Sequence, residues 1–157
     1  MKLWRIARAV HAPTGAAAFS GLGGTVVDGR WHSRGRAVVY SASSESLAKL
    51  EMLVHFSPAL APKLVLIEAS IPDKLVAQLT GAPPKGWDSV PDPGAGRSVG
   101  DTWLQGGSSV ALQVPSIHSK SEANVLINPA HPDFRLVVIG APVPFTFDRR
   151  LNDPALR

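Results

Sequence analysis

The stretch Gly29-Arg30-Trp31-His32-Ser33-Arg34-Gly35-Arg36, with the apolar run and the helix pattern that follow it, decides how the chain is interpreted. It places an arginine after a glycine turn, a tyrosine near the end of a predicted strand and a glutamate on a predicted helix: Arg30, Tyr40 and Glu51. Such a set suits a cleft that holds a phosphate, a flat ring and a developing positive charge. The rest of the chain is expected to frame that cleft.

Length and composition indicate one compact domain. The chain has 157 residues and is 45% hydrophobic, which is enough to bury a core. It has no cysteine, which excludes disulfides and Cys-ligated metals. The N-terminal residues lack the pattern of a signal peptide, and no run approaches the roughly 20 apolar residues of a membrane span. We therefore expect a single cytoplasmic domain over residues 1–157, with a loose tail over 149–157 and no membrane contact.

The net charge of +4 is spread along the chain rather than concentrated, which disfavours a nucleic-acid face. The densest basic group is Arg30, Arg34 and Arg36. Three guanidinium groups in a glycine-containing loop suit one or two phosphates. A solvated loop is the simpler interpretation of the charges taken alone.

The segment after Tyr40 predicts a helix capped by Ser43 or Ser44, with Glu45 favourably placed in its first turn. On a helical wheel the expected apolar face carries Leu47, Leu50, Leu53 and Val54. Glu51 lies about 40° from Leu47, at the margin of that face. Partial loss of water would strengthen the attraction of its carboxylate for a cation. An edge glutamate paired with a lysine or arginine is the structural alternative.

The remaining pattern predicts an α+β domain. Strands are expected over residues 3–7, 37–42, 63–70, 110–114, 124–127, 134–139 and 145–147. Further helices are expected over residues 73–79 and 98–105. Residues 11–29 predict a long loop anchored by Phe19, and the proline-rich residues 81–96 predict a surface excursion around Trp87.

Several site classes are disfavoured by their missing motifs. Gly21-Leu22-Gly23-Gly24 lacks the third glycine of a dinucleotide fingerprint, because Val26 stands there. The five histidines are scattered without an HExxH pair, which disfavours a metal site. No serine lies in a G-x-S-x-G elbow. Ser116, at a predicted strand end, can cap the following turn or line a cleft.

A series of short motifs, in order and at similar spacing, resembles the RES-domain family over almost the whole chain. The motifs are Trp4-Arg5-Ile6, Gly29-Arg30-Trp31, Val39-Tyr40, Leu47-Ala48-x-x-Glu51, Val114-Pro115-Ser116, Asn124-x-x-Ile127-Asn128-Pro129-x-His131-Pro132 and Phe147-Asp148-x-Arg150-Leu151. One departure is His32, where asparagine is more often expected, and this leaves the role of position 32 open.

The resemblance implies an ADP-ribosyltransferase-like fold, with small mixed sheets around an NAD-binding cleft and a few flanking helices. It implies the toxin of a type II toxin–antitoxin system that depletes NAD⁺ by phosphorolysis or hydrolysis of the nicotinamide–ribose bond. NAD⁺ would be the substrate, with no bound prosthetic group and no metal. An Xre-type helix-turn-helix antitoxin would cover the cleft, and DNA would be reached only through it. The alternatives are protein mono-ADP-ribosylation and a non-catalytic co-repressor role.

Carried over by motif, the expected catalytic residues are Arg30, Tyr40, Glu51 and Ser116. The expected NAD-binding residues are Arg30, Trp31, Tyr40, Ser116 and Asn124.

Each expected role has a chemical reason. Glu51 would stabilise an oxocarbenium-like ribose, Arg30 would grip the pyrophosphate, and Tyr40 would pack on the nicotinamide or cap the ribose. Ser116 would contact NAD⁺ or position Glu51. A surface ion pair, a core ring and a turn cap are the structural alternatives for Arg30, Tyr40 and Ser116. Phosphorolysis also needs a second anion pocket, for which the candidates are Arg34, Arg36 and Lys120.

Overall fold

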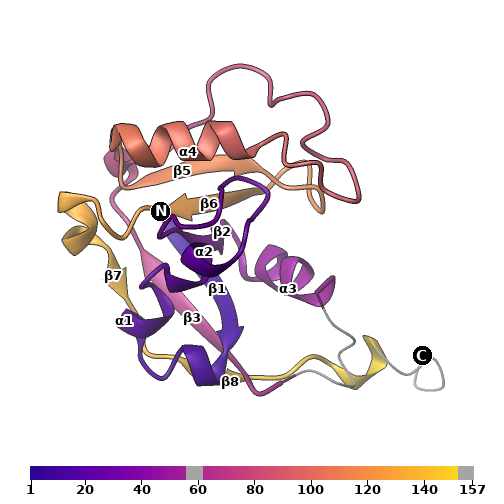
Figure 1. The fold of residues 1–157 in the computed structure, drawn as a ribbon. Helices are drawn as coiled ribbons and strands as arrows, with labels where there is room; N and C mark the ends of the chain where they lie inside the picture. The colour runs from indigo at the N-terminus through magenta and orange to yellow at the C-terminus, as the bar shows by residue number, and fades with distance from the viewer. Residues whose placement is uncertain (56–61, 152–157) are drawn as a thin grey trace.

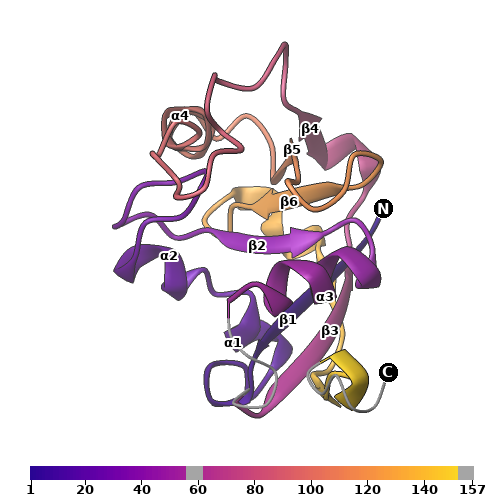
Figure 2. The same cartoon turned by 90° about the vertical axis from the view of Figure 1, so that its right-hand side faces the viewer.

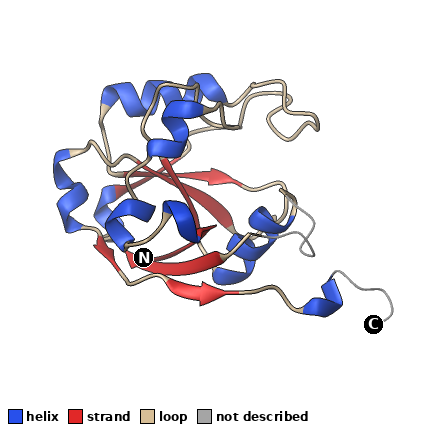
Figure 3. Cartoon of the chain, turned by 60° about the horizontal axis from the view of Figure 1, so that its bottom comes forward, coloured by secondary structure: helices blue, strands red, loops and turns tan. Residues whose placement is uncertain are grey.

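The computed structural model describes residues 1–55 and 62–151, which form an α+β fold with a curled mixed sheet and a few short helices (Figures 1 and 3). The strands occupy the middle of the molecule, and the helices and loops lie around them (Figure 3). In this part of the chain, no helix has the length and apolarity needed to cross a membrane.

The eight strands of the sheet follow the order β4-β5-β6-β2-β1-β3-β7, and β8 also pairs with β3. Every pair is antiparallel except β4 with β5. The strands are β1 (Lys2–Arg8), β2 (Val39–Ala42), β3 (Leu64–Ser70), β4 (Val76–Gln78), β5 (Ala111–Pro115), β6 (Ala123–Ile127), β7 (Val138–Ile139) and β8 (Val143–Phe145).

The helices are α1 (Gly15–Ala18), α2 (Leu22–Val26), α3 (Glu45–Leu53) and α4 (Arg97–Gly106). Short 3-10 turns cover Ala9–His11, Asp73–Leu75, Pro132–Leu136 and Arg149–Leu151. Helix α4 lies along β5 (Figure 1), where Trp103 from the helix and Leu112 from the strand enter the same buried cluster.

The contact between β1 and β2 divides the sheet into two parts. Strand β1 pairs with β3 over seven register positions, from Lys2 to Arg8, but with β2 at one position only, Trp4 opposite Ala42. Beyond that position, the guanidinium of Arg5 donates from Nη1 to the Tyr40 carbonyl oxygen at 2.6 Å. A side chain thus takes the place of ladder hydrogen bonds where these two strands diverge.

Helix α3 begins as its sequence predicts but presents a different face to the sheet. The Ser44 hydroxyl caps it by accepting from the Leu47 backbone N–H at 3.0 Å. Leu47 is fully buried, whereas Leu50 and Val54 are 43% and 58% exposed, so the expected apolar face is wrong for these two residues. The helix rests on β1 and β2 through Leu47 and Ala48 (Figure 2), and the next turn of that same face carries Glu51.

Other predictions need correction. Residues 11–29 contain α1 and α2 instead of a continuous loop, although Phe19 is fully buried, as an anchor should be. These helices are one turn long or little more, too short to show helical periodicity. The Thr14 hydroxyl caps α1 by accepting from the Ala17 N–H.

The segments predicted over residues 73–79 and 134–139 each split into a 3-10 turn and a short strand. Pairing with β5 draws Val76–Gln78 into the sheet. The predicted strand over residues 145–147 is shifted to Val143–Phe145, where β3 supplies its partner. In the expected loose tail, Arg149–Leu151 form a 3-10 turn, and residues 152–157 lie outside the described residues.

Candidate functional site

The carboxylate of Glu51 is the centre of a hydrogen-bonded group built by three segments of the chain. Its Oε1 atom accepts from the Ser116 hydroxyl at 2.7 Å and from Nδ2 of Asn124 at 2.6 Å. Hydrogen bonds to a charged acceptor are short and strong, so two donors on one oxygen fix the orientation of the carboxylate. The Glu51 side chain remains 30% exposed, which leaves it open to a ligand.

Sheet pairing explains why these donors meet. Asn124 on β6 lies opposite Ala42 on one side and Val114 on the other. Ser116 follows Val114 by two residues, directly after the end of β5. Helix α3, which follows β2, therefore places Glu51 beside the C-terminal end of β5 and the N-terminal end of β6. The structure brings together Glu51, Ser116 and Asn124, as the sequence-based hypothesis requires.

A histidine completes this group. Nε2 of His118 lies 3.8 Å from Oε2 of Glu51, and the His118 backbone N–H donates to the Ser116 hydroxyl oxygen at 3.0 Å. The histidine side chain is 27% exposed. Sequence reasoning missed His118 because it was considered only as one of several scattered histidines. The sequence did carry one signal for it: His118 follows Ser116 by two residues, and a serine hydroxyl commonly accepts from a backbone N–H two residues later.

Tyr40 lies on the same face of the sheet as Asn124. It pairs with Leu126 on β6, while Ala42, two residues later, pairs with Asn124. Side chains two residues apart point to the same face, so Tyr40 and Asn124 are diagonal neighbours with Cα atoms about 7–8 Å apart. The ring of Tyr40 is therefore close to the donors that hold Glu51.

The hydroxyl of Tyr40 is already occupied. It accepts from the Trp31 backbone N–H at 3.1 Å and lies 2.8 Å from Nδ1 of His32. Burial raises the pKa of this hydroxyl well above its ordinary value. These contacts commit the Tyr40 hydroxyl to the loop that carries Arg30, which disfavours the role of a ribose cap.

His32 has a scaffold role in this structure. It is 3% exposed, and burial lowers its pKa, which favours a neutral ring. A Cβ atom on Gly29 would lie 2.5 Å from the His32 ring and 2.6 Å from the Tyr40 hydroxyl. Glycine at position 29 therefore allows the turn to close on the His32–Tyr40 pair.

Arg30 contacts the excursion over residues 81–96. Its Nη1 atom donates to the carbonyl oxygens of Trp87 and, at 3.3 Å, Ser89, and it lies 3.6 Å from the Asp92 carboxylate. Within residues 1–55 and 62–151, no hydrogen bond or ion pair joins Arg30 to Glu51. Tyr40 links the two, since its ring shares a face with Asn124 and its hydroxyl contacts the residue after Arg30.

Residues 2–148 match the family model of the RES domain. The chain belongs to the RES-domain family. A protein from a Sphingobium species named "Prs ADP-ribosylating toxin" is 40% identical over 135 residues, covering 83% of each chain. A protein named "Toxin Res" from Pseudomonas putida is 39% identical over 155 residues, covering 96% of this chain and 99% of the relative.

A solved structure of the M. tuberculosis MbcT–MbcA toxin–antitoxin complex contains a chain with a similar fold. The TM-score is 0.70 at 16% sequence identity, and the match covers 99% of this chain and 85% of the other. This likeness concerns the fold alone: a curled mixed sheet with few helices.

In this RES domain, Arg5 is a second cation beside Tyr40, and sequence reasoning did not assign it a role. Burial lowers its pKa to about 10, so it remains protonated at neutral pH. Its bond to the Tyr40 carbonyl places it where β1 and β2 diverge. The Trp4-Arg5-Ile6 motif carried the signal, because Trp4 and Ile6 pack in one cluster and Arg5 faces the other side of the sheet.

Trp31 belongs to the core of the RES domain. Its side chain is 1% exposed and packs with Val38, Trp103 and Leu112. Its ring also lies 5.6 Å from that of Trp87, measured between centroids. This burial argues against the ligand contact expected of Trp31 and explains how the Gly-Arg-Trp motif anchors its loop instead.

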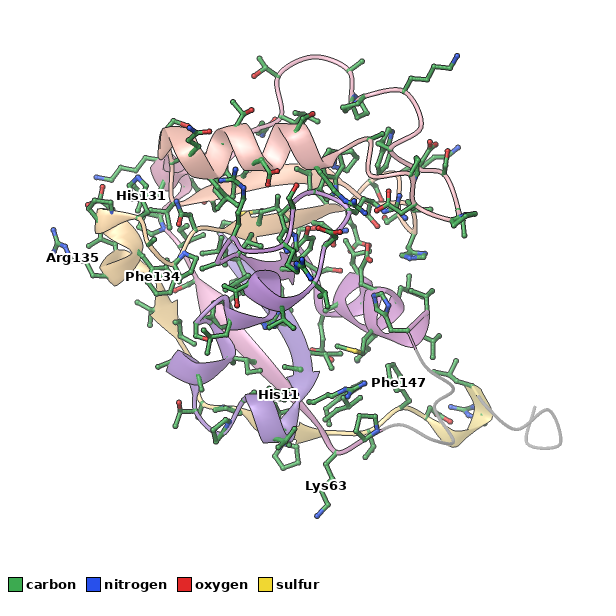
Figure 4. All side chains as sticks on the ribbon, in the orientation of Figure 1. His11, Lys63, His131, Phe134, Arg135 and Phe147 are labelled. Atoms are coloured by element: carbon green, nitrogen blue, oxygen red, sulfur yellow. The ribbon has the colours of Figure 1, made fainter. Side chains whose placement is uncertain are left out.

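Of the residues expected to form a second anion pocket, Arg34 and Arg36 make their contacts away from Glu51. Arg36 pairs with Asp101 at 3.0 Å and lines a surface hollow that also includes His131. No residue bonded to Glu51 lines this hollow, and His131 lies on the opposite side of the ribbon from α3 (Figure 4). Arg34 is exposed, and its backbone N–H donates to Asp28. Lys120 lies between β5 and β6.

Proposed function

We propose that this RES domain consumes NAD⁺ by breaking its nicotinamide–ribose bond, and that it acts as the toxin of a toxin–antitoxin pair. The observation that carries the proposal is the Glu51 carboxylate, oriented by Ser116 and Asn124 and still partly exposed. A fixed negative charge of this kind is what an oxocarbenium-like ribose requires.

The chemistry matches the available groups. Nicotinamide leaves NAD⁺ as a neutral ring, so its departure needs no general acid, and one carboxylate is sufficient to stabilise the ribose cation. Oε1 of Glu51 is held by its two donors, which leaves Oε2 for the substrate. Because the donors are in place before the substrate arrives, little reorganisation is needed during the reaction.

Two arginines flank Tyr40 and supply positive charge for the pyrophosphate. Arg5 bonds to the Tyr40 carbonyl, and Arg30 precedes the residue that donates to the Tyr40 hydroxyl. A planar guanidinium binds phosphate oxygens through paired donors. The pyrophosphate would exchange places with the carbonyl oxygens that Arg30 and Arg5 now contact, while the nicotinamide would rest on the Tyr40 ring.

Transfer of ADP-ribose to a protein is the second candidate. It is favoured by the name of the Sphingobium relative, an ADP-ribosylating toxin at 40% identity. Both reactions share the first bond cleavage and differ in the acceptor, which is phosphate or water in one case and a protein side chain in the other.

The partner we propose is an antitoxin that covers the site. MbcT, whose complex supplies the similar fold, is itself paired with an antitoxin, MbcA. Three apolar side chains next to site residues are exposed to different degrees: Leu50 (43%), Val54 (58%) and Ile117 (38%). A protein partner that buried them would also close access to Glu51. The resemblance of the motifs favours an Xre-type helix-turn-helix partner, through which the pair would contact DNA.

The test is to incubate the purified protein with NAD⁺, with and without phosphate, and to identify the products by mass. Free nicotinamide with ADP-ribose or its phosphate ester supports NAD⁺ cleavage, whereas a labelled protein supports ADP-ribosylation. Glu51→Gln should lower the rate about 10²–10³-fold. Glu45→Gln, in the first turn of the same helix and paired with Lys49, is the matched control. No loss of NAD⁺ would favour the co-repressor alternative.

A further inference from the structure

The imidazole of His118 faces the one oxygen of Glu51 that the protein leaves free. Oε1 is engaged by Ser116 and Asn124, while Oε2 lies 3.8 Å from Nε2 of His118. In the part of the chain that the structure describes, neither side chain has another ion-pair contact, and this one is an ion pair only when the imidazole is protonated. The gap is too long for a direct hydrogen bond.

The separation fits a third atom. An oxygen about 2.8 Å from both Nε2 and Oε2 can lie between them, since a typical O–H···O or N–H···O bond has that length. Both side chains are partly exposed, at 27% and 30%, so this position is open to a small molecule or a polar side chain. The pair therefore forms a subsite for one oxygen atom beside the carboxylate that faces the ribose.

The local backbone holds His118 in this position. The Ser116 hydroxyl donates to Glu51 and, with its oxygen, accepts from the His118 N–H at 3.0 Å. One side chain thus orients the carboxylate and fixes the turn that presents the imidazole. This double link fixes the backbone from which the imidazole projects toward Glu51.

We propose that His118 is a catalytic residue that holds and activates the acceptor oxygen. This inference rests on the proposed NAD⁺ cleavage. The C1′–N1 bond breaks and its electron pair leaves with neutral nicotinamide, while the acceptor oxygen forms the new bond to C1′. For water or a hydroxyl acceptor, the O–H proton passes to Nε2 of His118 and then to solvent. For an already ionised phosphate oxygen, the imidazole acts as a hydrogen-bond donor.

Base exchange separates this role from a structural one. When labelled nicotinamide replaces the original ring, the C1′–N1 bond breaks and re-forms without any oxygen acceptor. His118→Ala should therefore lower transfer to water or phosphate about 10²-fold or more while leaving exchange within about twofold of the wild type. Glu51→Gln should lose both reactions. His11→Ala, at the exposed end of the molecule near Lys63 (Figure 4), should change neither.

Two arms identify the acceptor: NAD⁺ in water alone and NAD⁺ with inorganic phosphate. In the water arm, added imidazole should restore part of the rate that His118→Ala loses. This rescue tests the role of His118 even if the wild type shows no measurable nicotinamide exchange. Equal loss of transfer and exchange, wild-type transfer in folded His118→Ala, or a failure of imidazole to restore any rate would overturn the role of His118. If the wild type left NAD⁺ intact, the proposed function itself would fail.

Discussion

Ser116 donates its hydroxyl to Glu51 at 2.7 Å and so joins two residues that lie 65 positions apart in the chain. Removing a hydrogen bond to a charged group costs about 1.5–3 kcal/mol. Ser116→Ala should therefore lower the rate of NAD⁺ cleavage about 10–100-fold, as measured by release of nicotinamide.

Asn124→Ala should have a similar effect, because its amide is the other donor to Oε1. The double variant should lose less than the product of the two single losses, since the donors share one acceptor atom. Ser119→Ala is the matched control, because the Ser119 hydroxyl accepts from the Glu122 N–H in the same turn and does not contact Glu51. Strictly multiplicative losses would contradict a shared function of Ser116 and Asn124.

Arg30→Lys should loosen the excursion over residues 81–96. Nη1 of Arg30 makes all three contacts, with the Trp87 and Ser89 carbonyls and with Asp92, and the lysine side chain is one bond too short to bring its ammonium to that position. We expect faster amide hydrogen exchange in that segment, together with weaker NAD⁺ binding. Arg34→Lys, which changes an exposed arginine of the same loop, should leave amide hydrogen exchange in residues 81–96 unchanged. If amide hydrogen exchange in residues 81–96 were unaltered in Arg30→Lys, Arg30 would not be holding the excursion in place.

Gly100→Ala should destabilise the fold. A Cβ atom at position 100 would lie 1.7 Å from the Trp31 carbonyl oxygen, so α4 would have to move away from the loop that carries Arg30. Overpacking of this kind costs about 1–3 kcal/mol or more. Gly106→Ala in the same helix meets no atom within 4 Å and should be neutral or slightly stabilising in urea unfolding. Equal stabilities of the two variants would refute the close contact.

The buried His32 should make stability dependent on pH. Its pKa is lowered in the folded state, whereas in the unfolded chain a histidine titrates near about 6.5. The unfolded state therefore binds more protons as the pH falls, and stability should decrease from about pH 6.5 downward. Urea unfolding at pH 7 and pH 5 should show a smaller decrease for His32→Asn than for the wild type. His11→Asn, at an exposed position, should behave like the wild type.

The sequence predicted most of the strands and the cap of α3 because these depend on local pattern. Trp4 and Ile6, two apolar residues on one side of Arg5's strand, mark β1, and a serine before Glu45 marks the helix start. The face of α3 was less certain: leucines every three or four residues predict a buried face, but Leu50 is exposed and Glu51 faces the sheet ends. Which side of a short helix meets the sheet depends on tertiary packing.

The candidate site was also predicted only in part, because some of its contacts depend on tertiary packing. Motif order indicated Glu51, Ser116 and Asn124, and the structure joins them. It could not indicate that Arg30 contacts the backbone of an excursion more than fifty residues away, since carbonyl groups leave no signature in sequence. The pairing of His118 with Glu51 was hidden because it depends on the turn that Ser116 holds.

The single register pair between Trp4 and Ala42 gives the molecule a pivot. A small rotation of the two parts of the sheet about this point would break few ladder bonds, and the polar link it would strain is the hydrogen bond between Arg5 and the Tyr40 carbonyl, while the buried cluster shared by β1, β2, β3 and β6 limits its extent. A dinucleotide phosphate can replace that carbonyl as the acceptor for the guanidinium. On the proposed function, entry of NAD⁺ would be coupled to a small opening at this point, because its phosphate would replace the hydrogen bond that the opening breaks.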